Sequence, residues 1–142
     1  MFCSKVLVAF DGSELSEKAL GRAALIAKRD PQIAVKVLVV RPQMQGDSMY
    51  ALIDESLFDS DAVYWDEIVN KVEHSLSQFK NSHSVTLIQG SPQTEILRFA
   101  EKQKCDLILM GSRGLTGIKE LLLGSVSHYV VQHAKIPVLI EK

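Results

Sequence analysis

The chain has 142 residues, 46% of them hydrophobic and 23% charged, which is ordinary for a soluble globular protein and enough for one domain with its own core. The formal net charge is -1 and the isoelectric point about 6.4, so no excess of basic residues points to nucleic acid or an anionic membrane as a partner. The longest apolar runs are only a few residues, far short of the roughly 20 that a membrane-spanning helix needs. We therefore expect a single domain over residues 1–142, with neither nucleic acid nor a membrane as partner.

The N-terminal residues and the cysteines bear on cellular location. Residues 1–12 contain an apolar run but no basic segment and no small-residue cleavage site, which favours a first strand over a signal peptide. Cys3 and Cys105 are too few for a disulfide framework, and we expect both to lie beside strands as small apolar residues. Together these features predict a cytoplasmic protein.

The first half of the chain alternates apolar runs with an amphipathic segment. Residues 5–10 and 33–40 are short valine-rich runs, typical of strands buried on both faces of a parallel sheet. Between them, Ser13 is a good N-cap for a helix that ends at Asp30-Pro31. We expect Arg41-Pro42 to stop the second strand, because proline cannot donate to a strand ladder.

The second half continues the same alternation. Residues 43–60 mix apolar and acidic side chains, and we expect a functional flap or a mobile loop with a short helix. Apolar residues from Trp65 to Phe79 recur at helical spacing, which predicts a long helix over about 61–80. The later elements are predicted to be a strand over 84–88, a helix starting at Ser91-Pro92, a strand over 106–110, a helix over about 125–133 and a strand over 137–140. Strict alternation predicts an α/β fold, an open parallel sheet with right-handed crossovers and helices on both faces.

The stretch over residues 107–127, LILMGSRGLTGIKELLLGSVS, has the layout of a phosphate site. An apolar run ends at Gly111, Gly114 follows, and Gly124-Ser125 comes after nine further residues. Glycines let backbone N–H groups come close to an anion, and a helix that begins near Ser125 offers unpaired N–H groups and the positive end of its dipole. In the alternative interpretation, Gly111 and Gly114 form a tight turn and Gly124 marks a helix boundary.

Asp11 is the acidic residue that the expected topology brings to this stretch. If the first and fourth strands are neighbours, their C-terminal ends place Asp11 beside Gly111. A carboxylate there can accept hydrogen bonds from ribose hydroxyls or hold the water shell of a magnesium ion. The alternative is a plain turn in which Asp11 or Ser13 caps the following helix. Neither G-x-x-x-x-G-K-[ST] nor a G-x-G-x-x-G after the first strand is present, which excludes a P-loop ATPase and a standard dinucleotide dehydrogenase.

These segments resemble the universal stress protein family. Its ATP-binding members share a pattern of glycine, two residues, glycine, nine residues, then Gly-Ser or Gly-Thr, and this chain fits every position. The resemblance also covers KVLVAFDGSELS, GSPQTEIL, DLILMGSRG, LLLGSVSHYVV and IPVLIEK, which is most of the chain apart from 43–60. It implies a Rossmann-like five-stranded parallel sheet of order 3-2-1-4-5, with ATP or AMP and Mg²⁺ as ligands.

The resemblance also implies roles for particular residues. Asp11 is similar to an aspartate at the nucleoside, and Val40 to a residue whose backbone meets the adenine edge. Arg113 and Lys119 either add positive charge at the phosphates or belong to the solvated surface. The positions to which the resemblance assigns the nucleotide are Ala9, Asp11, Val40, Met110, Gly111, Arg113, Gly114, Gly124, Ser125 and Val126.

The last strand suggests a partner. In the order 3-2-1-4-5 it is an edge strand, and its Val138 and Ile140 are apolar. An apolar unpaired edge invites another strand, and the family resemblance implies a homodimer joined there. The alternative is an edge covered by the terminal residues of the same chain.

Catalytic machinery is not evident. The four histidines, His74, His83, His128 and His133, lack metal-ligand spacing, and we expect surface or structural roles for them. We expect a solvated face for the acidic residues Asp54, Glu55, Asp59, Asp61, Asp66 and Glu67. No nucleophile has an evident base, so we name no catalytic residue and expect at most slow ATP hydrolysis, with Mg²⁺ held through the phosphates and Asp11 as a candidate contributor.

The leading hypothesis is thus an ATP-binding protein of the stress response that acts as a nucleotide-dependent regulator or sensor. Two alternatives stay open: a dimeric interaction module that binds no nucleotide, and a slow ATPase.

Overall fold

Parallel strands form the centre of the computed structural model, which describes residues 3–42, 55–114 and 122–142, with residues 55–61 as backbone only. The strands are β1 (Lys5–Ala9), β2 (Ala34–Pro42), β3 (His83–Gly90), β4 (Leu107–Gly111) and β5 (Val138–Glu141). They make one sheet in the order β3-β2-β1-β4-β5, and every pair of neighbours is parallel. This confirms the predicted fold class and strand order.

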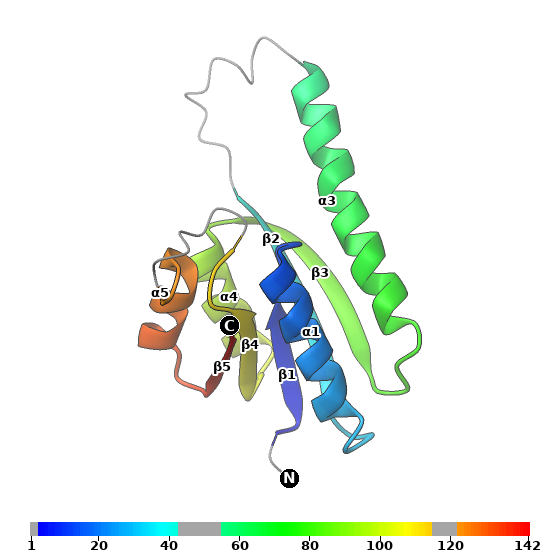
Figure 1. Ribbon diagram of the computed structural model, residues 1–142, viewed down its shortest axis with the longest axis vertical. Helices are drawn as coiled ribbons and strands as arrows, with labels where there is room; N and C mark the ends of the chain where they lie inside the picture. The colour runs from blue at the N-terminus through cyan, green and yellow to red at the C-terminus, as the bar shows by residue number, and fades with distance from the viewer. Residues whose placement is uncertain (1–2, 43–54, 115–121) are drawn as a thin grey trace.

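Helices cover both faces of the sheet (Figure 1). One face carries α1 (Glu14–Ala27) and α3 (Glu55–Leu76), and the other carries α4 (Pro92–Lys102) and α5 (Ser125–His133). Alternate residues of β1 enter opposite cores: Val6 and Val8 join the cluster under α1 and α3, whereas Leu7 joins the cluster under α4 and α5. Burial on both sides explains why the strands read as continuous apolar runs.

Most predicted element boundaries agree with the structure. Ser13 is the N-cap of α1, and its Oγ accepts a hydrogen bond from Ser16 N at 3.2 Å. The helix predicted over residues 125–133 coincides with α5. Cys3 and Cys105 are buried in the two different cores, as expected of small apolar residues, and burial raises the pKa of both thiols. None of the described helices is both long and apolar enough to cross a membrane.

The second strand ends at Pro42, two residues later than its predicted end at Val40. β2 runs through Pro42, which pairs with the last residue of β3. The backbone N–H and C=O groups of the even-numbered residues of β2 point toward β1. Ala34 N donates to Ser4 O at 2.9 Å, and Leu38 O accepts from Phe10 N at 3.0 Å. The ring nitrogen of Pro42 therefore points to the side where β1 has already ended, so its missing N–H removes no ladder bond.

The long helix α3 also differs from its predicted bounds of about 61–80. It already includes residues 55–60, which contain neither glycine nor proline to break a helix, and it ends at Leu76. Beyond Leu76 the chain turns, with Phe79 N donating to Leu76 O at 2.9 Å. The predicted apolar face is confirmed, since Trp65, Val72 and Leu76 are buried. Of the predicted flap or loop over 43–60, residues 43–54 lie outside the described residues.

Candidate functional site

Asp11 and Gly114 meet where β1 and β4 end. The strands pair in parallel, with Val8 opposite Leu109, so the segments that follow them leave the sheet side by side. Asp11 Oδ1 accepts a hydrogen bond from Ser13 N at 2.9 Å. A Cβ atom built on Gly114 would lie 2.6 Å from Asp11 Oδ2, closer than any ordinary contact. The interpretation of Asp11 as a turn residue is therefore confirmed, since one oxygen fixes the turn into α1, and its other oxygen faces the glycine-bearing segment.

A buried serine fastens that segment to its surroundings. Ser112 N donates to Glu141 O at 2.8 Å, and Ser112 O accepts from Gly124 N at 2.6 Å and from Ser127 Oγ at 2.7 Å. Ser112 and Ser127 are 3% and 2% exposed. These bonds tie the end of β4 both to the end of β5 and to the start of α5. Sequence reasoning missed both serines, because a serine beside a glycine is too common a pattern to single out.

The N-terminus of α5 faces the same region. Gly124 is its N-cap in extended conformation, and the helix begins at Ser125. The first N–H groups of a helix have no partner within the helix, and they carry its positive dipole end. The first turn of α5 contains no acidic residue that would compete for them. Gln93 at the start of α4 reaches Ser125 O with its Nε2 at 3.4 Å. This helix start is suited to an anion.

The need for glycine at position 111 comes from close packing against α1, not from the approach of Asp11, which contacts Gly114. A Cβ atom at Gly111 would lie 2.6 Å from Leu15 Cβ and 3.2 Å from the backbone carbon of Leu15. The end of β4 therefore passes directly under the first turn of α1, and only glycine leaves room for that approach. Gly124 is less crowded, since its Cβ would meet Ser112 O at 3.4 Å.

Three apolar positions that the resemblance assigns to the nucleotide share one face of the sheet. Ala9, Val40 and Met110 stand near the C-terminal ends of three neighbouring strands, and all belong to the core cluster under α4 and α5. Val126, in the first turn of α5, packs against that cluster. The structure thus brings these apolar positions together next to the Asp11 turn and the α5 N-terminus. Arg113 is half-buried, whereas Lys119 lies outside the described residues.

The titratable side chains offer no catalytic cluster within the described residues. All four histidines are exposed, and the rings of His83 and His133 are hydrogen-bonded to the backbone oxygens of Asn81 and Tyr129, which confirms surface roles. Asp66 and Glu67 are exposed, as predicted for a solvated face; the side chains of the other four acidic residues lie outside the described part. No group of three or more histidine, cysteine or acidic residues in that part could hold a metal ion.

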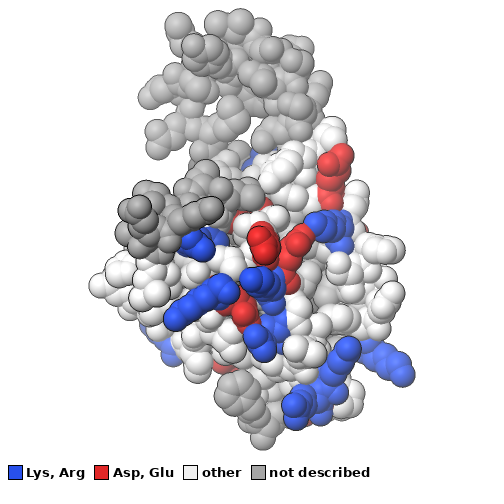
Figure 2. All heavy atoms as spheres, viewed as in Figure 1, with Lys and Arg blue, Asp and Glu red and all other residues white. Residues whose placement is uncertain are grey.

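Charges of both signs are interspersed on the face that Figure 2 shows. Two ion pairs link different elements: Arg22 Nε on α1 lies 2.5 Å from Glu141 Oε1 on β5, and Lys71 on α3 pairs with Glu17 on α1. The hydrogen bond and charge of Glu141 raise the pKa of the Arg22 guanidinium. This surface therefore carries no single sign of charge.

Comparison with known proteins places the whole described frame in one family. The sequence model of the universal stress protein family matches residues 3–142. The universal stress protein MJ0531 of Methanocaldococcus jannaschii is 35% identical over 142 aligned residues, which cover 97% of this chain and 81% of that protein. The solved structure of MJ0577 from the same organism is 27% identical with a TM-score of 0.86, covering 100% of this chain and 97% of that one. A universal stress protein solved in complex with cAMP is 25% identical with a TM-score of 0.72, covering 100% and 99%. The chain therefore belongs to the universal stress protein family.

Proposed function

We propose that this universal stress protein binds an adenine nucleotide, ATP with Mg²⁺ in the first place, between Asp11 and the start of α5. The observation that carries the proposal is the approach of Asp11 to Gly114: a Cβ there would lie 2.6 Å from Oδ2, so only glycine lets the segment after β4 pass this close to the carboxylate. Ser112 of the same segment is hydrogen-bonded to the start of α5. A hydrogen-bond acceptor beside an anion site is what a nucleoside phosphate requires. The relative solved with cAMP supports an adenine nucleotide as the ligand class.

Each part of the ligand has a matching part of the chain. The phosphates would lie at the N–H groups of Gly114 and of the first turn of α5, from Ser125 to Val126. Asp11 Oδ2 would accept hydrogen bonds from the ribose hydroxyls or from water molecules on Mg²⁺. A magnesium ion fits this arrangement because it keeps several waters and needs only one or two carboxylates besides the phosphates. Arg113 would add positive charge to the phosphate side.

The apolar positions complete the proposed site. Val40 is 8% exposed, and with Ala9 it would flank the adenine ring at the strand ends, whereas Met110, 5% exposed, would lie along the ribose and phosphates. Such a small apolar surface next to a few polar groups is the usual composition of a cofactor site. We therefore extend the proposal to all the positions that the family resemblance assigns. The role of Gly111 among them is to leave room for the first turn of α1.

The site is proposed to serve occupancy rather than turnover. Rapid phosphoryl transfer needs a residue that positions the attacking water and cations that stabilise the transition state. The described histidines are exposed, and the carboxylate of Asp11 already accepts a bond from Ser13 N. We propose a nucleotide-dependent regulator of the stress response, with ATP hydrolysis slow at most.

We also propose a homodimer through β5. This strand is the last in the sheet order and pairs with β4 on one side. Val138 and Ile140 are half-buried and pack against the core under α4 and α5. A second copy would pair with the free side of this strand. Sedimentation velocity tests the dimer, and a single species of monomer mass at micromolar concentration would contradict it.

Isothermal titration calorimetry with ATP and Mg²⁺ tests the nucleotide proposal, with GTP as the matched ligand. We expect saturable heat and a raised melting temperature with ATP and a weaker response to GTP. Absence of both signals at millimolar ATP would contradict the proposal and favour the alternative, a dimeric interaction module that binds no nucleotide. Sustained phosphate release that is lost in Asp11→Ala would instead identify a true ATPase.

A further inference from the structure

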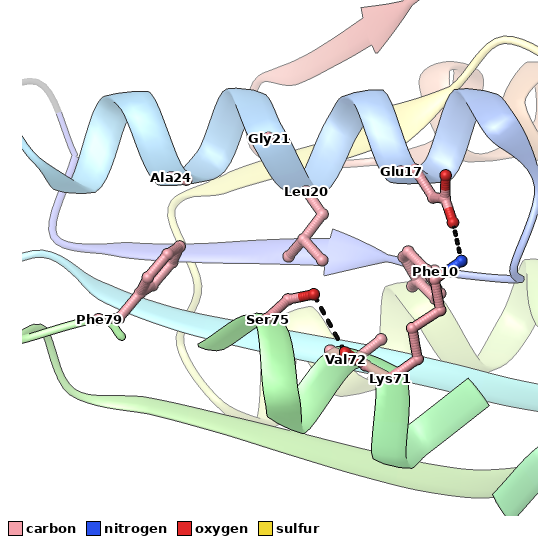
Figure 3. Close-up of a pocket in the computed structure, with 9 residues that line it drawn as sticks. All are labelled: Phe10, Glu17, Leu20, Gly21, Ala24, Lys71, Val72, Ser75 and Phe79. Carbon is pink, nitrogen blue, oxygen red and sulfur yellow. Dashed lines mark hydrogen bonds and ion pairs between the residues drawn. The ribbon is translucent and has the colours of Figure 1, made fainter. Parts of the chain in front are cut away.

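A groove lies between α1 and α3, on the opposite face of the sheet from Ala9, Val40 and Met110. Its cavity volume is about 390 Å³. Figure 3 shows the two helices on either side, with Leu20 and Phe79 pointing into the space between them. Neither the glycine-bearing segment after β4 nor the start of α5 lines it. The groove is therefore a feature separate from the proposed nucleotide site.

Short side chains keep the groove open. On α1 it is lined by Gly21 and Ala24, and on α3 by Ser75. Gly21 stands inside a helix, where glycine is less favourable than alanine. A Cβ atom at Gly21 would meet nothing within 4 Å, so neither close packing nor a special backbone angle requires glycine there. What this glycine does provide is open space facing α3.

Polar contacts link the two helices at both ends of the groove. Lys71 on α3 pairs with Glu17 on α1 at one end. At the other end the two N–H groups on Nδ2 of Asn81, which follows α3, are shared among three carbonyl oxygens within residues 27–33 that lie at 2.8 to 3.1 Å. The groove thus has the structure of a preformed pocket, because these contacts do not depend on what fills it.

The lining defines the chemistry of an occupant. Two aromatic rings, Phe10 and Phe79, together with Leu20 and Val72 make an apolar floor. The volume is at the lower end of the range for small-molecule pockets, which fits a molecule of one or two rings. Aromatic side chains favour an aromatic partner through edge-to-face or offset stacking.

The rim determines the charge of the occupant. Glu17 and Lys71 already pair with each other, so an anion or a cation at the rim would have to break that pair to gain an opposite charge. A neutral group that can donate or accept a hydrogen bond meets no such penalty. We propose that this groove binds a small neutral aromatic molecule with one hydrogen-bonding group, its ring between Phe10 and Phe79 and its polar group at the Glu17–Lys71 rim.

Three ligands that share one ring system test the proposal: indole, which is neutral, indole-3-acetate, an anion, and tryptamine, a cation. In ¹H–¹⁵N spectra we expect indole to shift amides around Gly21, Ala24 and Ser75 with a dissociation constant of about 1 mM, and the two ions to bind more weakly. Saturable shifts confined to other parts of the protein, or none at millimolar indole, would overturn the proposal. Shifts of the groove amides with protein concentration alone would mean that a second copy covers it, and would also overturn it.

Two leucine substitutions on α1 provide the matched pair. Gly21→Leu fills the groove and should abolish the indole shifts, while its melting temperature stays at or above that of the wild type because leucine favours the helix. Lys18→Leu adds the same side chain at an exposed position outside the groove and should leave binding unchanged. Equal indole binding by both variants would overturn the assignment.

A rim variant tests the charge argument separately. Lys71→Met leaves Glu17 as the only charge of the pair, so tryptamine should gain roughly two- to fivefold in affinity over indole. An unchanged ratio would show that the rim does not select the ligand, against the proposal.

Discussion

Replacing Gly114 by alanine is the most direct test of the proposed nucleotide site. The new Cβ would stand 2.6 Å from Asp11 Oδ2, so the carboxylate must move by about 0.8 Å to restore an ordinary 3.4 Å contact. The backbone itself admits alanine, since among the described residues only Gly12 is a glycine with positive φ. The perturbation therefore falls on the carboxylate.

The expected loss is in affinity rather than in stability. Charge-assisted hydrogen bonds from Asp11 to a ligand contribute about 1.5–3 kcal/mol, so displacing the carboxylate should weaken ATP binding roughly 10- to 100-fold. The bond from Ser13 N to Asp11 Oδ1 is half-exposed, and losing it should cost about 1 kcal/mol or less of folding stability. Reduced freedom of the unfolded chain offsets part of that cost.

Calorimetric titration of a double-mutant cycle measures the effect. Gly114→Ala, Asp11→Ala and the double variant are titrated with ATP and Mg²⁺, and Gly21→Ala serves as the glycine-to-alanine control outside the site. If alanine acts by displacing the carboxylate, Gly114→Ala should have little further effect once Asp11 is absent. Full additivity of the two losses, or unchanged affinity in Gly114→Ala, would refute the reasoning.

Three further predictions concern stability. Gly21→Ala should raise the free energy of unfolding by about 0.5–1 kcal/mol, since it improves helix propensity without meeting any neighbour; a lowered melting temperature in scanning calorimetry would contradict this. Ser127→Ala should lower the free energy of unfolding, measured with urea, by about 1 kcal/mol. The substitution removes the 2.7 Å bond to Ser112 O, while Gly124 N still donates to that oxygen. Burial raises the pKa of the Asp106 carboxyl, but hydrogen bonds from Ser4 and Lys5 outweigh it and hold that pKa below its ordinary value. Its stabilisation is therefore present above about pH 4 and lost as pH falls further, so Asp106→Asn should be less stable at pH 7 and converge with the wild type in acid unfolding.

Sequence reasoning predicted those parts of the fold that local chemistry determines. The helix predicted to begin after Gly124 and to end at His133 coincides with α5. The strand order followed from the alternation of elements together with the family resemblance. The end of β2 could not be predicted, because whether Pro42 interrupts a ladder depends on which neighbour its nitrogen faces. That direction is a property of the assembled sheet.

The candidate site divides in the same way. The glycine spacing singled out Gly111, Gly114 and Gly124, and the topology predicted that Asp11 would lie beside Gly111. In the structure the carboxylate of Asp11 lies against Gly114 instead. The role of Gly111 was not predictable, since the crowding atom belongs to Leu15 in another element. Ser112 likewise gains its role only through tertiary contacts with distant segments. Residues whose partners are local, or follow from strand order, can be read from sequence, whereas residues defined by a particular long-range contact cannot.

The bond from Ser112 N to Glu141 O makes the end of β5 a structural support for the segment that follows β4. Glu141 holds the end of β4 with its backbone and Arg22 of α1 with its side chain. Shortening the protein by its final two residues would release both attachments together, although neither residue is among those assigned to the ligand. A variant that lacks Glu141 is therefore expected to unfold at a lower temperature, because two parts of the fold lose an attachment at once.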